Sequence, residues 1–296
     1  MTNIGFVGLG HMGLPMAINL VKAGFRVVGY DLQPTVLEEF AQAGGCIASE
    51  LKEAAIGQDV IITMLQKGGQ VLEVCSKTQG LLHHAKAGTL FIDCSTIDVQ
   101  SAQSLHQQAQ NSQILCVDAP VSGGVAGAVA GSLTFMVGGE EQAYDKAHPI
   151  LLKMGQKVIH TGPAGSGQAA KICNNMILGI SMIAISEAFV LAKQLGLSEK
   201  KLFEVVNNAS GQCWSMSKYV PVAGILDHVP ANRDFKPGFA ALMMLKDLKL
   251  SQEAAHSVDI QTPLGAQATA LYQQLVDEGL GDLDFSAVIA LMNPKK

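Results

Sequence analysis

The chain of 296 residues has few charged and few aromatic side chains. Charged residues make up 15% of the sequence and aromatic residues 5%, whereas hydrophobic residues make up 48%. This composition excludes a disordered or fibrous protein and predicts a large buried core. The net charge is −5, and no run of Lys or Arg is longer than the terminal Lys295-Lys296 pair. We therefore expect no nucleic acid as a partner, because a phosphate backbone requires a basic surface.

Long hydrophobic runs and paired cysteines are also missing. The longest apolar stretch, Met176 to Ile185, is interrupted by Ser181 and is shorter than the roughly 20 residues that span a membrane. A strand-like run begins at Asn3 and leaves no room for a cleavable leader, so we expect a cytoplasmic protein without a membrane partner. The six cysteines form no C-x-x-C pair and have no neighbouring His set. They predict reduced thiols and no metal site.

The first half of the chain alternates short β-branched runs with amphipathic segments. Candidate strands are Ile4-Val7, Arg26-Tyr30, Val60-Met64, Thr89-Ile92, Ile114-Val117, Thr134-Val137 and Lys157-His160. The helical period appears between them in Met12-Ala23, Val36-Ala43 and Val99-Ala109. This alternation predicts an α/β fold with a mainly parallel, doubly wound sheet.

The pattern changes after the turn at Gly162 to Gly165. From Gln168 to Leu195 the sequence has one long helical pattern that is apolar on most sides, which indicates a buried helix between two domains. Few β-branched runs follow, and the remaining helical segments are Glu199-Asn207, Leu242-Ala255 and Pro263-Glu278. The sequence therefore predicts a sheet domain over residues 1–164 and an all-α domain over residues 165–296.

A glycine motif stands where the first strand meets the first helix. It reads Gly8-Leu9-Gly10-His11-Met12-Gly13. The first glycine permits a tight turn, the second lets the backbone approach a pyrophosphate, and the third allows close packing of helix on strand. The N-terminus of the helix adds partial positive charge. The motif predicts a Rossmann-type domain that binds a dinucleotide.

Asp31 closes the next predicted strand, 18 residues after Gly13. A carboxylate at this place accepts hydrogen bonds from both ribose hydroxyls and repels a 2′-phosphate, which favours NAD over NADP. An alternative is that Asp31 only caps the following helix.

Small residues follow a later predicted strand in Asp118-Ala119-Pro120-Val121-Ser122-Gly123-Gly124. They belong to the rim of the sheet, where open α/β folds bind ligands. The hydroxyl of Ser122 and the backbone N–H groups of Gly123 and Gly124 suit a carboxylate. The alternative is a flexible loop of small residues.

Lys171 lies on the long apolar helix, with Asn174 and Asn175 three and four residues later. These three side chains share nearly the same helix face. An amine that acts as a base near neutral pH needs a lowered pKa, and burial on an apolar helix supplies such a shift. The alternative is a lysine whose amine reaches solvent from the first turns of the helix.

The sequence resembles the β-hydroxyacid dehydrogenase family over essentially its whole length. Four ordered segments carry the resemblance: the glycine motif with Pro15-Met16-Ala17, the segment Asp118 to Gly124, the segment Gly167 to Asn175, and Lys246-Asp247-Leu248. The resemblance implies that Lys171 is the catalytic acid/base and that Asn175 acts beside it. The substrate would be held by Ser122, Gly123, Gly124, Lys171, Asn174, Asn175, Trp214, Phe239 and Asp247.

The same resemblance assigns the cofactor site. NAD would be bound by Gly8, Leu9, Gly10, His11, Met12, Gly13, Asp31, Met64, Leu65, Gln66, Thr96 and Lys246. Gln66 departs from the family pattern, in which Pro is usual, and this bears on the geometry of that turn.

Within the family, the segments Ser210 to Ser215 and Asp284 to Ser286 are similar to 3-hydroxyisobutyrate dehydrogenases. The resemblance implies NAD-dependent oxidation of 3-hydroxyisobutyrate to methylmalonate semialdehyde in valine catabolism, by a homodimer or homotetramer acting on a small hydroxycarboxylic acid. Trp214 and Phe239 would pack on the substrate methyl group, unless the Trp is simply part of the core. Competing interpretations are a relative acting on tartronate semialdehyde, serine or 4-hydroxybutyrate, and a nucleotide-binding protein without catalysis. The presence of Lys171 argues against the last.

Overall fold

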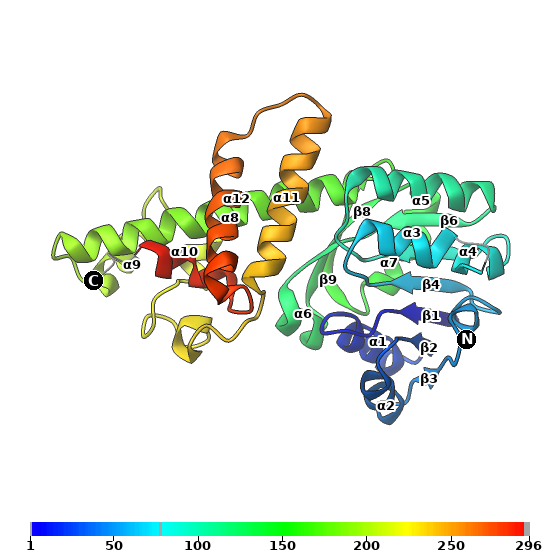
Figure 1. The fold of residues 1–296 in the computed structure, drawn as a ribbon. Helices are drawn as coiled ribbons and strands as arrows, with labels where there is room; N and C mark the ends of the chain where they lie inside the picture. Colours follow the sequence, from blue (N-terminus) through cyan, green and yellow to red (C-terminus); the bar gives the residue numbers. More distant parts are fainter. Residues whose placement is uncertain (1, 77–78, 293–296) are drawn as a thin grey trace. The chain divides into compact units, whose positions relative to one another are not determined.

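The computed structural model describes residues 2–76 and 79–292. The chain divides into two compact units, Met1–Lys171 and Ile172–Lys296 (Figure 1). The division falls inside the longest helix, α8 (Ser166–Gln194), which the sequence pattern predicts to within two residues at its N-terminus and one residue at its C-terminus. The predicted domain boundary at residues 164 and 165 stays a prediction.

A single sheet forms the centre of the first unit. Its strand order is β3-β2-β1-β4-β5-β6-β8-β7, and β9 pairs with β8. The strands are β1 (Asn3–Val7), β2 (Arg26–Tyr30), β3 (Cys46–Ile47), β4 (Val60–Thr63), β5 (Leu90–Asp93), β6 (Leu115–Asp118), β7 (Val121–Ser122), β8 (Leu133–Gly138) and β9 (Gly155–Gly162). β1 to β6 are parallel, whereas β8 runs antiparallel to β6 and β7. The expected mainly parallel, doubly wound sheet is confirmed.

Helices cover both faces of this sheet. The first unit contains α1 (Gly13–Lys22), α2 (Pro34–Gln42), α3 (Gly68–Ser76), α4 (Leu81–His84), α5 (Val99–Asn111), α6 (Gly124–Ala130), α7 (Glu141–Leu151) and the short 3-10 helix η1 (Leu51–Ala54). Buried side chains of α1, α6 and α7 pack in one hydrophobic cluster, and those of α3, α4 and α5 pack in a second.

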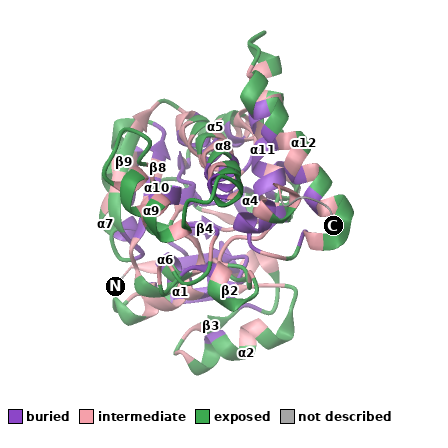
Figure 2. Ribbon diagram, turned by 90° about the vertical axis from the view of Figure 1, so that its left-hand side faces the viewer, coloured by how far each residue is buried: buried purple, intermediate pink, exposed green. Residues whose placement is uncertain are grey.

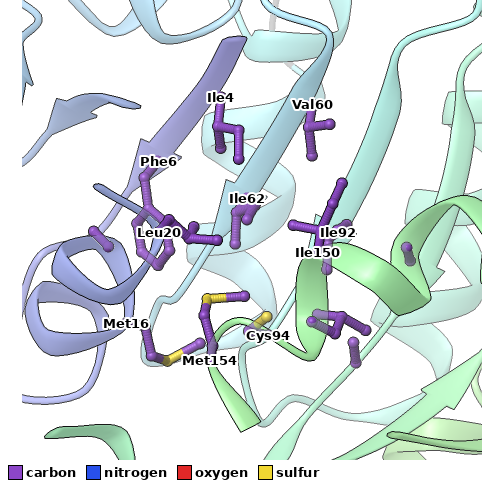
Figure 3. Close-up of a cluster of buried hydrophobic side chains, with 14 of the residues drawn as sticks. Ile4, Phe6, Met16, Leu20, Val60, Ile62, Ile92, Cys94, Ile150 and Met154 are labelled. Atoms are coloured by element: carbon purple, nitrogen blue, oxygen red, sulfur yellow. The ribbon is translucent and has the colours of Figure 1, made fainter. Parts of the chain in front are cut away.

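Successive side chains of a strand point to opposite faces of the sheet, and this explains why the strands contribute to both hydrophobic clusters. In β4, Val60 and Ile62 belong to the cluster under α1, whereas Ile61 belongs to the other. Figure 3 shows the first cluster, where strand residues such as Ile62 face Met16 and Leu20 of α1. In Figure 2, α2 is mostly green and pink because Phe40 is its only buried residue.

Helices and short helical turns make up the described part of the second unit. They are α9 (Glu199–Asn207), α10 (Trp214–Lys218), η2 (Pro230–Arg233), α11 (Ala241–Ser257), α12 (Pro263–Leu275), the π-helical turn η3 (Val276–Leu280) and η4 (Phe285–Met292). Met182 and Ile183 of α8 pack in a core with Leu248 of α11 and Tyr272 of α12. The predicted all-α character of this region is confirmed, and one isolated bridge joins Ala240 to Asp284.

Among the helices of residues 2–76 and 79–292, α8 is the one that is long and apolar enough to cross a membrane, judged by length and composition alone. Its most apolar window is 44% buried within the protein. Core helices of soluble proteins pass the same test, and α8 also carries the buried polar residues Gln168, Lys171, Asn175 and Ser186.

Candidate functional site

The three glycines of the β1–α1 turn are present for different structural reasons. Gly8 has a φ of +94°, and a Cβ there would lie 2.3 Å from the carbonyl oxygen of Met64. A Cβ on Gly13 would lie 1.9 Å from the carbonyl oxygen of Gly8. A Cβ on Gly10, in contrast, would meet no protein atom within 4 Å. The first and third glycines are therefore required by the fold, whereas Gly10 leaves open space at the turn, as close approach of a pyrophosphate requires.

The N-terminus of α1 is suited to an anion. Met12 occupies the N-cap without a side-chain cap hydrogen bond, and the first turn contains no acidic residue. Unpaired backbone N–H groups and the helix dipole both favour phosphate at such a position. His11 is exposed beside this turn and Leu9 is buried beneath it.

Asp31 connects the end of β2 to the glycine turn. One of its carboxylate oxygens accepts a hydrogen bond from the Leu9 backbone N–H at 2.7 Å, and the other accepts from the Gln33 backbone N–H at 2.9 Å. Asp31 therefore does more than cap α2, which begins at Pro34. Its negative charge is fixed beside the dinucleotide turn, where it disfavours a 2′-phosphate.

A cavity of about 450 Å³ opens beside Asp31, within the size range of small-molecule sites. It is lined by Val7, Gly8, Tyr30, Asp31, Leu32, Leu51, Leu65, Gln70, Glu73, Val74, Gln79 and Gly80. Apolar walls with the carboxylates of Asp31 and Glu73 among them suit an adenosine, which has a flat aromatic base and two ribose hydroxyls. The sequence indicates Asp31 but not the helix α3 residues that form the far wall.

Two further cofactor candidates follow neighbouring strands. Met64, Leu65 and Gln66 come directly after β4, and Thr96 comes after β5, so parallel strand ends bring them to the same edge of the sheet. The Gln66 backbone N–H donates to the side chain of Gln70 at 3.2 Å. Proline has no such N–H, so the departure from the family pattern gives this turn a hydrogen bond that proline cannot make.

The small-residue segment is ordered rather than a loose loop. Ser122 lies in β7 opposite Thr134, and α6 begins at Gly124. Gly123 and Gly124 have φ values of +136° and +62°, a region in which residues with a Cβ are strained. The backbone therefore adopts the glycine-favouring conformations on which the predicted carboxylate site depends, although the sequence pattern did not indicate a helix here.

Lys171 lies on α8 and is 7% exposed. Asn175 is 1% exposed and follows one helical turn later, while Asn174 is half-buried. The alternative of an amine that reaches freely into solvent does not fit this degree of burial.

Asn175 belongs to a chain of polar contacts within the second unit. Its side-chain amide donates to the carboxylate of Asp247 on α11 and accepts from the amide of Asn174 at 2.9 Å. Lys246 lies 3.6 Å from the other oxygen of Asp247. The structure thus brings together four residues that the sequence predicts for the site, and these contacts fix the orientation of the Asn175 amide.

Aromatic rings from distant segments stack elsewhere in this unit. Trp214 is 52% exposed and stacks on Tyr219 with ring centroids 5.0 Å apart. Tyr219 stacks in turn on Phe285 at 5.3 Å, and Phe239 contacts Phe285 at 5.7 Å. Trp214 is therefore not a core residue, and one surface of its ring is accessible.

A buried carboxylate supports the aromatic stack. Asp284 is fully buried and accepts hydrogen bonds from the Tyr219 hydroxyl at 2.9 Å and from the backbone N–H groups of Gly238 and Phe239. Burial and the Asp284 charge raise the pKa of Tyr219 well above its usual value, so the phenol stays a hydrogen-bond donor. Sequence reasoning placed Asp284 in a family-like segment but did not foresee this role.

Two further buried carboxylates lie in the first unit: the sequence indicates Asp118 only as the start of the small-residue segment, and it does not indicate Asp93. Asp118 accepts from His106 at 3.0 Å and from the backbone N–H groups of Gly165 and Gln168, so it caps the start of α8. Asp93 accepts from Thr63 and Ser95. In the sequence, the only indications of such contacts are the polar residues at the ends of the predicted strands and the long helical pattern of α8.

Two family models match the chain end to end. Residues 3–162 match the NAD binding domain of 6-phosphogluconate dehydrogenase, and residues 165–292 match the model described as NAD-binding of NADP-dependent 3-hydroxyisobutyrate dehydrogenase. A probable 3-hydroxyisobutyrate dehydrogenase of Mycobacterium bovis is 48% identical over 289 residues, covering 98% of this chain and 97% of that protein. The chain belongs to the β-hydroxyacid dehydrogenase family.

Other relatives of this dehydrogenase carry two different substrate names. An NAD-dependent L-serine dehydrogenase of Pseudomonas aeruginosa is 44% identical, with 99% of each chain covered. A solved structure titled as the Mycobacterium tuberculosis 3-hydroxyisobutyrate dehydrogenase with L-serine has a TM-score of 0.94 and 46% identity, covering 99% of this chain and all of that one.

The family and the fold together establish the coarse activity. The protein is an NAD-dependent hydroxyacid dehydrogenase, and the predicted family, Rossmann-type fold and NAD cofactor are confirmed. Among the described residues, no cluster of three or more His, Cys, Asp or Glu side chains has the arrangement of a metal site.

Proposed function

We propose that this enzyme oxidises 3-hydroxyisobutyrate to methylmalonate semialdehyde, with Lys171 as the general acid/base. The observation that carries the proposal is the burial of Lys171, a residue only 7% exposed, one helical turn from Asn175. Burial disfavours the charged ammonium, and a neutral amine is the form that accepts a proton.

The reaction breaks two bonds to hydrogen. The C3–H bond of the substrate breaks and its electron pair leaves with the hydrogen as hydride, while the hydroxyl proton passes to Nζ of Lys171 and a C=O bond forms. NAD supplies the hydride acceptor when bound. In the reverse direction the protonated amine returns its proton to the carbonyl oxygen.

The other proposed residues position the reactants. Asn175 orients the reacting hydroxyl through an amide that Asp247 and Asn174 hold in place. Ser122 and the glycine N–H groups after it receive the substrate carboxylate. Fixing both ends of so small a substrate aligns C3 for hydride transfer, and such orientation accounts for a large part of enzymatic rate acceleration.

The proposed cofactor residues divide by the part of NAD that they meet. The turn from Gly8 through Leu9, Gly10, His11 and Met12 to Gly13 binds the pyrophosphate, and Asp31 accepts from the ribose. The segment Met64, Leu65 and Gln66, together with Thr96 and Lys246, lines the rest of the cofactor.

The substrate choice rests on the aromatic stack. 3-Hydroxyisobutyrate and L-serine share a carboxylate and a C3 hydroxyl, and differ in a methyl or an ammonium group at C2. An accessible apolar ring such as Trp214 favours the methyl group, because an ammonium loses hydration against an apolar surface. L-Serine is the second candidate, since its name appears with two relatives at 44% and 46% identity.

A substrate comparison tests this choice. We expect kcat/KM with NAD to be at least about 10-fold higher for 3-hydroxyisobutyrate than for L-serine, glycerate or 4-hydroxybutyrate, within the range that one methyl group contributes. Trp214→Ala is expected to reduce this ratio several-fold. Leu264→Ala changes another exposed apolar side chain, on α12, and is expected to leave the ratio unchanged. A higher kcat/KM for L-serine in the unaltered enzyme would replace the first candidate by the second.

The proposal extends to the location of the enzyme, its pathway, the roles of its two domains and its oligomeric state. We infer a cytoplasmic enzyme of valine catabolism, in which residues 1–164 bind NAD and residues 165–296 contribute to substrate closure and to a homodimer or homotetramer. Support for self-association comes from exposed apolar residues of the second unit, including Ile177, Leu191 and Ile260.

A further inference from the structure

Gln168 is a fully buried polar residue in the first turn of α8 to which the proposed chemistry gives no role. Its side-chain oxygen accepts from the Ile97 backbone N–H at 3.0 Å, and its side-chain nitrogen donates to the Ser95 carbonyl at 2.7 Å. Its backbone N–H donates to the Asp118 carboxylate at 2.9 Å. Both polar ends of this amide are therefore satisfied by long-range partners.

The two backbone groups held by Gln168 flank Thr96, the residue proposed to line the cofactor. A primary amide that binds the carbonyl before a residue and the N–H after it fixes the backbone of that residue on both sides. Gln168 also lies three residues before Lys171, on the same helix and nearly the same face.

Ser95 extends this connection to the neighbouring strand end. Its hydroxyl accepts from the Leu65 backbone N–H at 2.8 Å and donates to Asp93 at 2.6 Å. Asp93 in turn accepts from Thr63 at 2.8 Å. The segments after β4 and β5 and the start of α8 are thus linked by one continuous set of buried hydrogen bonds within the first unit.

We propose that Gln168 is a positioning residue, which fixes the Thr96 segment relative to the helix that carries Lys171. This inference rests on the proposed function, because it assigns Gln168 the task of aligning the cofactor edge with the catalytic amine. Hydride and proton transfer depend steeply on alignment, and a misplacement of about 1 Å reduces rates by roughly 100-fold. Binding of the distant pyrophosphate and ribose depends instead on the glycine turn and Asp31.

Replacement by a side chain of similar length without hydrogen bonds tests this separation. For Gln168→Met we expect the rate of NADH formation in the first turnover, measured by stopped flow at saturating substrate, to fall at least 10-fold. The Kd for NADH, measured by fluorescence titration, is expected to change less than about 3-fold. The substrate is whichever of 3-hydroxyisobutyrate and L-serine the unaltered enzyme oxidises faster.

Gln58 provides a matched control. It is also a buried glutamine of the first unit, 5% exposed, and its amide donates to the backbone carbonyls of Glu53 and Ile56. Gln58→Met is expected to lower the melting temperature while leaving the first-turnover rate near that of the unaltered enzyme. If Gln168→Met does not fold, Gln168→Leu takes its place, since it also removes both side-chain hydrogen bonds and introduces no buried charge.

Lys171→Met, measured in the same assay, distinguishes a failure of the proposed function from a failure of the positioning role of Gln168. Turnover by the unaltered enzyme and its loss in Lys171→Met support the proposed function by themselves. A normal first-turnover rate in Gln168→Met, or an equal loss in Gln58→Met, then overturns the positioning role alone. Turnover that survives in Lys171→Met overturns the proposed function and the positioning role together.

Discussion

At the scale of single residues, one buried carboxyl group has a shifted pKa although it has no role in the proposed chemistry. Asp93 is fully buried, and its second oxygen has no hydrogen-bond partner among the described residues. Burial raises its pKa to about 6, although hydrogen bonds from Ser95 and Thr63 oppose this shift. The fold therefore favours the protonated carboxyl.

Asp93→Asn is expected to become stabilising relative to the natural residue as the pH rises. The pKa of Asp93 is about 6 in the folded chain against an ordinary 3.8, so its stabilising contribution is complete below about pH 4 and is lost as the pH rises through 6. The difference in unfolding free energy between the variant and the unaltered enzyme should rise by roughly 2 kcal/mol between pH 4 and pH 7. Urea unfolding at intervals of one pH unit measures it.

Asp59 provides a control of opposite sign. Hydrogen bonds from the Asn3 backbone and from Lys86 lower the pKa of Asp59, so its contribution to stability is lost as the pH falls. Asp59→Asn should therefore lose stability relative to the unaltered enzyme as the pH rises toward 3.8, the ordinary pKa, and should change little between pH 4 and pH 7. A flat difference for Asp93→Asn over the same pH range would contradict the raised pKa.

At the scale of elements, the β1–α1 turn divides its glycines into two groups. Gly13→Ala would place a Cβ against the Gly8 carbonyl and should lower both stability and NAD affinity. Gly10→Ala meets open space in the protein, so we expect a melting temperature within about 2 °C of the unaltered enzyme, since a surface change without lost contacts alters stability by only about 0.5 kcal/mol. Its Kd for NAD should nevertheless rise at least 10-fold, because the added methyl group occupies space that the pyrophosphate approaches.

Gly69→Ala, on α3, is the matched control for this pair, because a Cβ there also meets no protein atom within 4 Å. It should change neither the melting temperature nor the NAD affinity by much. Calorimetry for stability and isothermal titration for affinity distinguish the three variants. Unchanged NAD affinity in Gly10→Ala would show that the pyrophosphate does not approach this part of the turn.

The elements also show how far the sequence predicts the fold. The sequence pattern predicts α1, α5 and α8 to within a few residues, because α1 and α5 present a regular apolar face to a core and α8 is a long run that is apolar on most sides. It misses α6, whose Gly-Val-Ala-Gly-Ala-Val-Ala sequence has no polar face, and α7, which contains Pro149. The two-residue strands β3 and β7 are too short for an alternating pattern.

The same limit applies to the candidate site. Gly8, Gly13 and Asp31 are predictable because their roles depend on local spacing in one βαβ unit. The hydrogen bond from Gln168 to Ser95 joins residues 73 positions apart, and the one from Tyr219 to Asp284 joins residues 65 positions apart. No local pattern encodes such pairs, so only the folded chain reveals the connections that hold Thr96 and the aromatic stack in place.

At the scale of the whole molecule, two kinds of unit contribute different parts of the chemistry. In the proposed function, the first unit supplies the glycine turn, Asp31 and Lys171, and the second supplies Asn175, Asp247 and Trp214. Relatives that align with nearly the full length of the chain carry hydroxyacid dehydrogenase names. The central claim is that a buried lysine moves the proton in this reaction.

The most direct test is the rate of NADH formation from 3-hydroxyisobutyrate by the unaltered enzyme and by Lys171→Met. We expect kcat to fall at least 1,000-fold in the variant, within the range attributed to general acid–base catalysis, while its NADH Kd stays within a few-fold. Lys193→Met, which alters an exposed lysine of the same helix, should retain full activity. Full turnover in Lys171→Met at saturating substrate would contradict the account.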